Sequence, residues 1–163
     1  MADRYKRMGA LQLFCALVVA SGLTFAQTRT TKKFVDFKAF LQAFFQSALW
    51  AGITVLHVIL DNGPTHAPKQ LATWLASLEL SFEVRLYWLP TYASWLDQVE
   101  IIFSKVQRDV LTPSDFASTV ALEHTLLTYF ADLNQHPKPI EWTYTKTKLF
   151  AKFGEPPPTQ LAA

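Results

Sequence analysis

The sequence predicts an α/β domain, because short apolar segments typical of strands alternate along it with longer segments of helical periodicity. The predicted order is strand, strand, helix, strand, helix, strand, helix, helix. Strands that alternate with helices run parallel in such domains, so we expect the last two strands to be parallel. The chain has 163 residues, half of them hydrophobic, which suffices for one domain with a sizeable core and excludes a disordered chain.

The first half of the chain begins with two predicted strands, residues 11–19 and 23–30, joined by a turn at Ser21-Gly22. A helix follows in residues 32–50, since one of its faces carries apolar residues at helical spacing: Phe34, Phe37, Leu41, Phe44 and Ala48. Residues 53–60 are β-branched and apolar on both faces, which predicts a strand covered on both sides.

The second half continues the alternation. A helix is expected at residues 67–78, with Pro68 in its first turn, and a strand at 82–90 that Pro90 ends. Two amphipathic helices follow, at residues 96–111 and 119–135. Residues 1–153 would form the domain. The proline-rich residues 154–163 are expected to be a disordered tail.

The formal net charge is only +2, so a nucleic-acid partner has to be recognised by a local basic patch rather than by overall charge. The single cysteine, Cys15, excludes an internal disulfide and a cysteine-based zinc site. This cysteine usage fits the reducing cytoplasm.

The N-terminal region has a second interpretation. Residues 4–27 contain basic residues, then an apolar run, then small residues, as a secretory signal does. The apolar run is too short to span a membrane. On composition alone, a strand hairpin and the signal of a small secreted protein both stay open, and the motifs described next favour the hairpin.

Asp61 ends the otherwise apolar strand at residues 53–60 and shares one face with Val55, His57 and Ile59. Ligands of parallel sheets bind beyond the carboxyl ends of the strands, where Asp61 is expected. A buried carboxylate needs a turn, a basic partner or a metal. From this stretch alone, an Asx-type turn with the following Asn62-Gly63 is the simpler interpretation.

Glu100 lies in the first turns of the predicted helix at residues 96–111. It borders the apolar stripe, together with Ser104 and Gln107, where the buried face meets solvent. The alternative for any such glutamate is a solvated surface side chain. The stripe itself consists of Val99, Ile102, Phe103, Val106 and Val110.

These segments together carry a resemblance to a known family. A strand ends in Asp61-Asn62 with His66 nearby, and the next strand ends at Pro90. The turn "SWL" then leads to Asp97 and Glu100, which lies 39 positions after Asp61. Over residues 4–153, the chain resembles the transposases of bacterial insertion sequences related to the mariner elements. The catalytic part of these proteins is the DDE endonuclease domain, a ribonuclease-H-like mixed sheet flanked by helices.

The resemblance implies metal-dependent cleavage and transfer of DNA strands, with transposon ends as the DNA partner. In the family, three carboxylates hold two Mg²⁺ or Mn²⁺ ions, which prefer such hard oxygen ligands. Asp61 corresponds to the second acid and Glu100 to the third, so both are expected to be catalytic metal ligands. Asp97 stands where the family usually has Asn, and we expect it to face solvent.

The first acid of the family has no counterpart here, since only Asp3 precedes the segment "YKR" and it lies in no predicted strand. The strand that carries this acid is normally the central, first strand of the sheet. We therefore expect an N-terminally truncated domain that lacks this strand and is inactive alone. It would pair with an upstream transposase polypeptide or a second copy, or persist as a non-catalytic remnant that binds DNA or dimerises.

Further side chains are candidates for contact with DNA. Lysine and arginine would meet phosphates, while aromatic rings would stack on an exposed base. His66 would orient a phosphate or water, or cap the next helix. Trp95 would stack on a base or pack the start of the helix against the core. His57 is too far along its strand from Asp61 to share a metal and is expected in the core or at an edge. The candidate DNA contacts are Asn62, His66, Lys69, Tyr92, Trp95 and Arg108.

Overall fold

A computed structural model describes residues 9–90, 96–112, 115–143, 145, 147, 148 and 151 of the chain. All eight predicted elements are present in the predicted order, with ends that differ by a few residues. The candidates Tyr92 and Trp95, and the tail at 154–163, lie outside the described residues. The elements are β1 (Gln12–Leu17), β2 (Thr24–Arg29), α1 (Phe34–Phe45), β3 (Val55–Leu60), α2 (Pro68–Ala76), β4 (Glu83–Trp88), α3 (Val99–Asp109) and α4 (Thr119–Gln135).

The strands form two small sheets. β1 and β2 are an antiparallel hairpin in which Gln12 lies opposite Arg29, so the hairpin interpretation of this region is confirmed. β3 and β4 are parallel, with Val55 opposite Glu83, as predicted for the later strands. Within the described residues, no ladder joins the hairpin to the parallel pair. The predicted class, a mixed α/β fold with helices flanking the strands, is confirmed.

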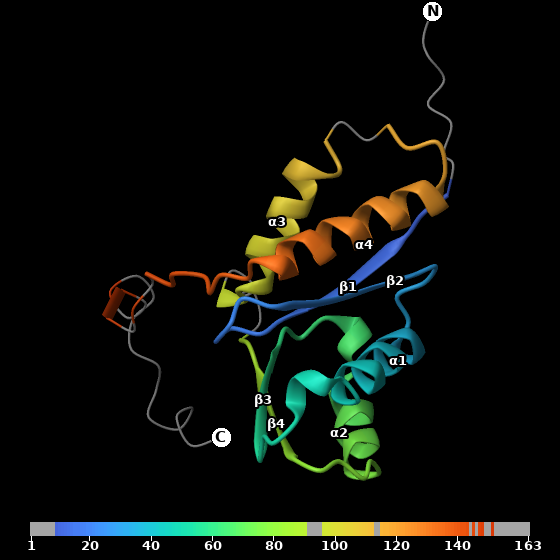
Figure 1. Ribbon diagram of the computed structural model, residues 1–163. Coiled ribbons are helices and arrows are strands. Elements are labelled where there is room, and N and C mark those ends of the chain that lie inside the picture. Colours follow the sequence, from blue (N-terminus) through green and yellow to red (C-terminus); the bar gives the residue numbers. More distant parts are fainter. Residues whose placement is uncertain are drawn as a thin grey trace, which may run out of the picture.

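The hairpin lies between two layers of helices. Figure 1 shows α3 and α4 on one side of it, and α1 and α2 on the other side beside β3 and β4. Side chains of β1 alternate between the layers. Phe14 and Ala16 pack on the side of α1, whereas Leu13, Cys15 and Leu17 pack on the side of α3 and α4. β1 is therefore apolar on both faces, like a strand in the interior of a sheet.

α1 supplies most of the core on its side of the hairpin. The buried face of α1 is wider than the apolar face predicted from the spacing, because two further phenylalanines of the helix are also buried. The Phe14 ring of β1 lies 5.7 Å from that of Phe40, and the Phe25 ring of β2 lies 5.4 Å from that of Phe44. These contacts fix the hairpin on the helix. The buried residues of α1 are Phe37, Phe40, Leu41, Phe44 and Phe45.

α4 is held on the other side of the hairpin by hydrogen bonds to β2. Asn134 Oδ1 accepts the Thr24 backbone N–H at 2.8 Å and the Thr24 hydroxyl at 3.0 Å, and Asn134 Nδ2 donates to the Thr24 carbonyl at 2.7 Å. Near the other end of α4, Glu123 accepts a hydrogen bond from the Thr28 hydroxyl. Thr24 and Thr28 are buried, so these bonds satisfy polar groups that would otherwise be costly.

The prediction that β3 is covered on both sides is wrong. Ile59 is 51% exposed, and Tyr87 on the neighbouring strand is 45% exposed. His57 is also exposed, and its Nδ1 lies 3.0 Å from the Tyr87 hydroxyl. A uniformly apolar strand pattern cannot show whether a second layer covers the strand. The described helices of this chain leave that face open, and none of them is long and apolar enough to cross a membrane.

Candidate active site

Asp61 directly follows β3, and its side chain forms the turn that its sequence context predicted. The Gly63 N–H donates to Asp61 Oδ1 at 2.8 Å. A Cβ on residue 63 would lie 2.9 Å from that oxygen, so glycine permits this close approach. The same oxygen lies 2.7 Å from His66 Nδ1. The turn and the basic partner are therefore both present, and the carboxylate remains 37% exposed.

His66 lies in a short 3₁₀ turn, Pro64–His66, between β3 and α2. Its ring packs against Phe37 of α1 with the centroids 4.6 Å apart, which fixes the ring beside Asp61. The interpretation of His66 as a cap of the next helix is wrong, because the N-cap of α2 is Ala67 and no side chain caps that end. Ala67 has a left-handed φ of 40°, and it turns the chain into α2.

Asn62 links the carboxyl ends of the two parallel strands. Its Nδ2 donates to the carbonyl of Leu89, just beyond β4. The Leu89 N–H in turn donates to the carbonyl of Leu60 at 2.8 Å. These bonds hold the loop that follows Asp61 against the end of β4.

Glu100 lies in the first turn of α3, as predicted, and its side chain is exposed, as in the alternative of a surface glutamate. The prediction that Asp97 faces solvent is wrong, since its side chain is half-buried. α3 begins only at Val99, so Asp97 precedes the helix and helical geometry does not set its direction. Instead, Asp97 Oδ1 accepts the Val99 backbone N–H at 3.2 Å.

The three carboxylates act on one another. Burial raises the pKa of Asp97, and the negative charge of Asp61 raises it further. Burial also raises the pKa of Glu100, to which the charges of Asp97 and Asp61 contribute. Asp61 and Glu100, which are 39 positions apart in the sequence, therefore lie close enough for their charges to interact. A cation near these groups would relieve the repulsion.

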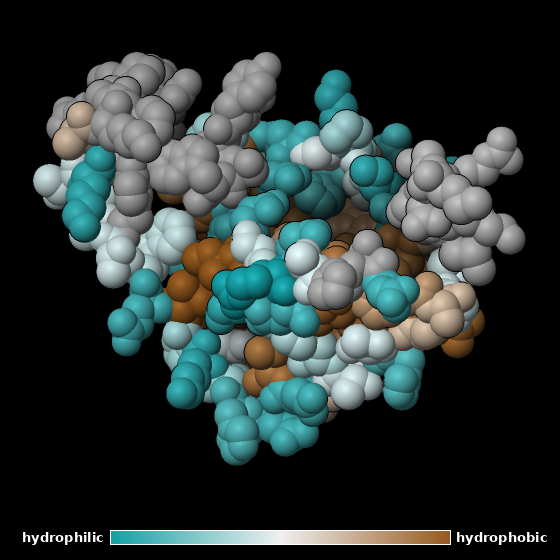
Figure 2. Space-filling model, turned by 90° about the horizontal axis from the view of Figure 1, so that it is seen from above, coloured by the Kyte–Doolittle hydropathy of each residue, from teal (hydrophilic) through white to brown (hydrophobic). Residues whose placement is uncertain are grey.

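All three carboxylates line a cavity of about 910 Å³ between the hairpin and β3. Figure 2 shows hydrophobic surface recessed between hydrophilic side chains on the face seen from above. Cys15 lines this cavity, and burial, followed by the charge of Asp97, raises the pKa of its thiol to about 12. Gln98 also lines it, and its Oε1 is buried without a hydrogen-bond partner in the described part of the chain. The prediction did not include Gln98, whose only sequence signal is its place between Asp97 and Glu100.

The described residues do not make a complete metal site. Among them, no three His, Cys, Asp or Glu side chains lie close enough together to hold a metal ion. Asp61 Oδ1 is also engaged by His66 and by the Gly63 N–H. Asp61 and Glu100 offer the hard oxygen atoms that Mg²⁺ prefers, but they need at least one more ligand.

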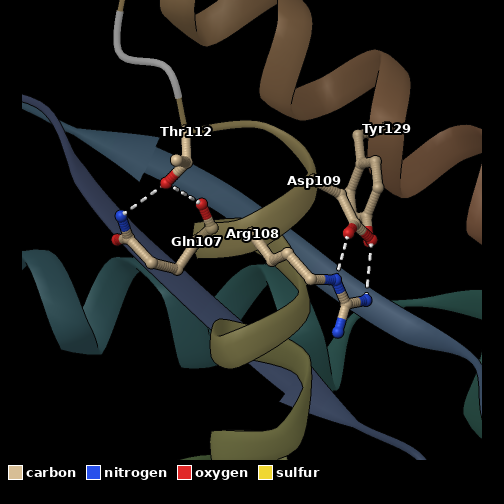
Figure 3. A network of polar contacts seen from close by, with 5 residues as sticks. All are labelled: Gln107, Arg108, Asp109, Thr112 and Tyr129. Atoms are coloured by element: carbon tan, nitrogen blue, oxygen red, sulfur yellow. Dashed lines mark hydrogen bonds and ion pairs between the residues drawn. The ribbon is translucent and has the colours of Figure 1, made fainter.

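Arg108 lies near the far end of α3 from Glu100 and is 71% exposed. Its Nε lies 2.7 Å from Asp109 Oδ1, and a second guanidinium nitrogen lies 3.3 Å from Oδ2. The Tyr129 hydroxyl of α4 donates to Asp109 Oδ2 at 2.8 Å (Figure 3). This pairing occupies part of the Arg108 guanidinium. Lys69, in the first turn of α2, is exposed.

The comparisons with known proteins bear on this site. The sequence model of the family described as DDE superfamily endonuclease matches residues 2–123 of the chain. The chain belongs to the DDE superfamily of endonucleases. The part of this DDE endonuclease that matches includes Asp61, Asp97 and Glu100.

A search of curated proteins found no match to this DDE endonuclease. Among solved structures, it is similar to the catalytic core domain of BIV integrase in crystal form I. The two chains are 18% identical, the similarity covers 86% of this chain and 85% of that chain, and the TM-score is 0.48.

Proposed function

We propose that this DDE endonuclease is the catalytic-domain portion of an insertion-sequence transposase related to the mariner group, acting on transposon ends. The observation that carries the proposal is the position of Asp61 and Glu100. They come from the end of β3 and the start of α3, line one cavity and interact electrostatically. Membership of an endonuclease family supports phosphodiester cleavage as the reaction class.

In this proposal, Asp61 and Glu100 are ligands for Mg²⁺ or Mn²⁺, of which the complete family site would hold two. Such ions supply the Lewis acidity for displacement at phosphorus. His66 positions the Asp61 carboxylate through Oδ1. Because the described residues include no third ligand beside these two, we expect the chain alone to bind the ions weakly and to transfer little or no DNA.

Contacts to DNA would come from a few side chains, since the formal net charge is only +2. Lys69 and Arg108 are exposed and would meet phosphates. Asn62 and His66 lie beside Asp61, and both form polar contacts within the protein. We therefore propose that their main role is to hold the loop in shape, and that contact with DNA is secondary. Tyr92 and Trp95 are proposed to stack on a base near the cleavage site.

A second candidate is a non-catalytic remnant of a transposase that binds DNA or dimerises. The observation that favours it is the lack of a three-ligand group among the described residues, together with the engagement of Asp61 Oδ1 within the protein.

The test is strand nicking by the purified chain in Mg²⁺ or Mn²⁺ on DNA with the terminal repeats of the insertion sequence that encodes it. It is run with and without the polypeptide encoded upstream. Asp61→Asn and Glu100→Gln should each abolish nicking, because each removes one anionic ligand without changing the side-chain size. Glu79→Gln, at an exposed position after α2, is the matched control and should leave nicking unchanged. Nicking that survives both site variants refutes the assignment. DNA binding without nicking in every mixture favours the remnant.

A further inference from the structure

β4 has an outer edge on the side away from β3. In the part of the chain that the structure describes, β4 pairs with β3 alone. The Glu83 N–H donates at 2.9 Å to the carbonyl of Thr54, which directly precedes β3. Main-chain groups alternate in direction along a strand, so those of Glu83 and Arg85 point toward β3. The N–H and C=O groups of Val84 and Leu86 therefore point to the outer edge.

An apolar hollow of about 370 Å³ lies beside this edge, between α2 and β4. All residues that line it are alanine, leucine, valine or phenylalanine. Leu75 of α2 forms one side, and Val84 and Leu86 of β4 form another. Among the described residues that line it, none belongs to β3, so the hollow lies on the outer side of β4. The edge thus combines main-chain groups that need partners with an apolar surface, as a strand-pairing interface does.

The face of β4 away from α2 carries the two charges of the strand. Arg85 Nε lies 2.7 Å from Glu83 Oε1, and both side chains are exposed. Side chains alternate along a strand, so these two lie on the face opposite to Val84 and Leu86. Any strand that pairs with the outer edge places its own side chains beside Glu83 and Arg85. A partner with an acid and a base two positions apart, met in reverse order, would match them.

A second copy of β4 in antiparallel orientation provides this match. With Val84 of both copies on a two-fold axis, Glu83 lies opposite Arg85 of the second copy, and the reverse pair forms as well. Phe82 then lies opposite Leu86 of the second copy, which joins the two apolar hollows. The outward main-chain groups of Val84 make the pair on the axis a hydrogen-bonded one. The Glu83–Arg85 pairs are then of the other kind, in which opposite side chains lie closer together.

The charges also select this register over its neighbours. An axis moved by one residue to Arg85 would place the two copies of Arg85 opposite each other. An axis moved to Glu83 would do the same with the two glutamates. Like charges directly opposite each other are unfavourable. The sequence of the strand is therefore complementary to itself about Val84.

We propose that the outer edge of β4 is a homodimer interface, at which two antiparallel β4 strands join the parallel pairs of two copies into one four-stranded sheet. Such an interface uses the same surface patch on both copies, as two-fold dimers do. None of the described residues of β4 lines the cavity that contains Asp61, so the dimer would leave that cavity open. The interface is independent of DNA cleavage.

The experiment is analytical ultracentrifugation of the full chain over a concentration series. One short strand from each copy makes a small interface, so we expect a dissociation constant of roughly 1–100 μM. Glu83→Arg and Arg85→Glu should each weaken the dimer by about tenfold or more, because each substitution puts like charges opposite each other in both symmetry-related pairs. Both side chains are exposed, so the two variants should keep the fold.

A mixture of the two variants tests the register itself. One copy then carries arginine at both positions and the other carries glutamate at both, so opposite charges face each other in every pair. The mixture should form a heterodimer, although each variant alone is largely monomeric. Val84→Pro removes an outward N–H without affecting the ladder to β3, and it should abolish the dimer.

The matched control is Glu141→Arg, at an exposed position after α4, which should leave the dissociation constant unchanged. A chain that stays monomeric well above the expected concentration range overturns the proposal. A dimer that both charge reversals leave intact also overturns it, since another surface would then hold the copies together. Failure of the two variants to associate on mixing overturns the register about Val84, and with it the proposed interface.

Discussion

His66 joins the candidate site to the core of the protein. Its Nδ1 lies 2.7 Å from Asp61 Oδ1, while its ring packs 4.6 Å from the Phe37 ring of α1. The position of the carboxylate after β3 thus depends on a helix that precedes the strand. A carboxylate held only by bonds within its own loop would have more conformational freedom.

The first prediction concerns this link. His66→Ala should lower the free energy of unfolding by about 1 kcal/mol, because it removes a polar contact to Asp61 and an aromatic contact to Phe37 that are each worth up to about that amount. Urea denaturation measures the change. His57→Ala, at an exposed position bonded to Tyr87, is the control and should change the free energy by less than about 0.5 kcal/mol. Equal effects of the two substitutions would show that His66 does not stabilise this region.

The second prediction concerns Asp97, whose pKa lies above its ordinary value of 3.8 in the folded chain. A raised carboxyl pKa means that the folded state binds the proton more tightly than the unfolded state. Ionisation therefore costs stability at neutral pH, and the cost disappears as the pH falls below 3.8. Asp97→Asn should raise the free energy of unfolding at neutral pH by roughly 1 kcal/mol, the scale of one relieved charge interaction.

The measurement is denaturant unfolding of both proteins across the acid range. The gain from Asp97→Asn should shrink as the pH falls, because Asn also accepts the Val99 N–H and only the charge is lost. Asp115→Asn, at an exposed position before α4, is the control. A destabilised Asp97→Asn protein at neutral pH would mean that the carboxylate has a cationic partner in solution.

The elements were predictable because their signals are local. The spacing of phenylalanines in α1, Pro90 after β4 and the Ser21-Gly22 turn depend only on nearby residues. The order and spacing of Asp61 and Glu100 match the pattern of the family that the chain resembles, and this match identifies them as candidate metal ligands. The structure adds that their charges interact.

Other features depend on contacts between distant segments. The direction of Asp97 depends on where α3 begins. The helix was predicted from residue 96 but begins at Val99, and sequence patterns do not resolve a shift of three residues in a helix end. The exposure of Ile59 depends on which layers cover β3, which an apolar strand pattern cannot show. The cavity between the hairpin and β3 lies between two sheets that no ladder joins in the described part of the chain, and this is a property of the tertiary structure alone.

The third prediction concerns the attachment of α4 to the hairpin. Asn134→Ala removes three hydrogen bonds to Thr24 and leaves buried backbone groups unpaired, so it should cost about 2–3 kcal/mol of unfolding free energy. Gln135→Ala, at the next position, removes one exposed contact to Asp132 and should cost less than about 0.5 kcal/mol. Thermal unfolding measures the midpoint temperatures of the two variants, and Asn134→Ala should unfold at the lower temperature. Similar midpoints would show that the contact with Thr24 does not stabilise the protein.

The fourth prediction concerns Tyr129. Burial, followed by its hydrogen bond to Asp109, raises the pKa of this tyrosine to about 12. The folded state therefore holds the phenol proton more tightly than the unfolded state, and this contribution to stability is lost as the pH rises above the ordinary value of 10. Ultraviolet titration of tyrosinate should show a component near pH 12 that Tyr129→Phe removes. The same component in the variant would assign it to another tyrosine.

The last prediction concerns the availability of Arg108 to DNA. Asp109 engages its guanidinium at two nitrogens, so Arg108→Ala should weaken DNA binding less than Lys69→Ala does. Asp109→Asn weakens that pairing and removes a negative charge, and it should strengthen binding. If Arg108 then meets a phosphate, the slope of log affinity against log salt should steepen by about one. Fluorescence anisotropy over a salt series measures the slope. The double variant Arg108→Ala with Asp109→Asn separates the two causes, because a steeper slope that survives the loss of Arg108 would show that the arginine does not reach DNA.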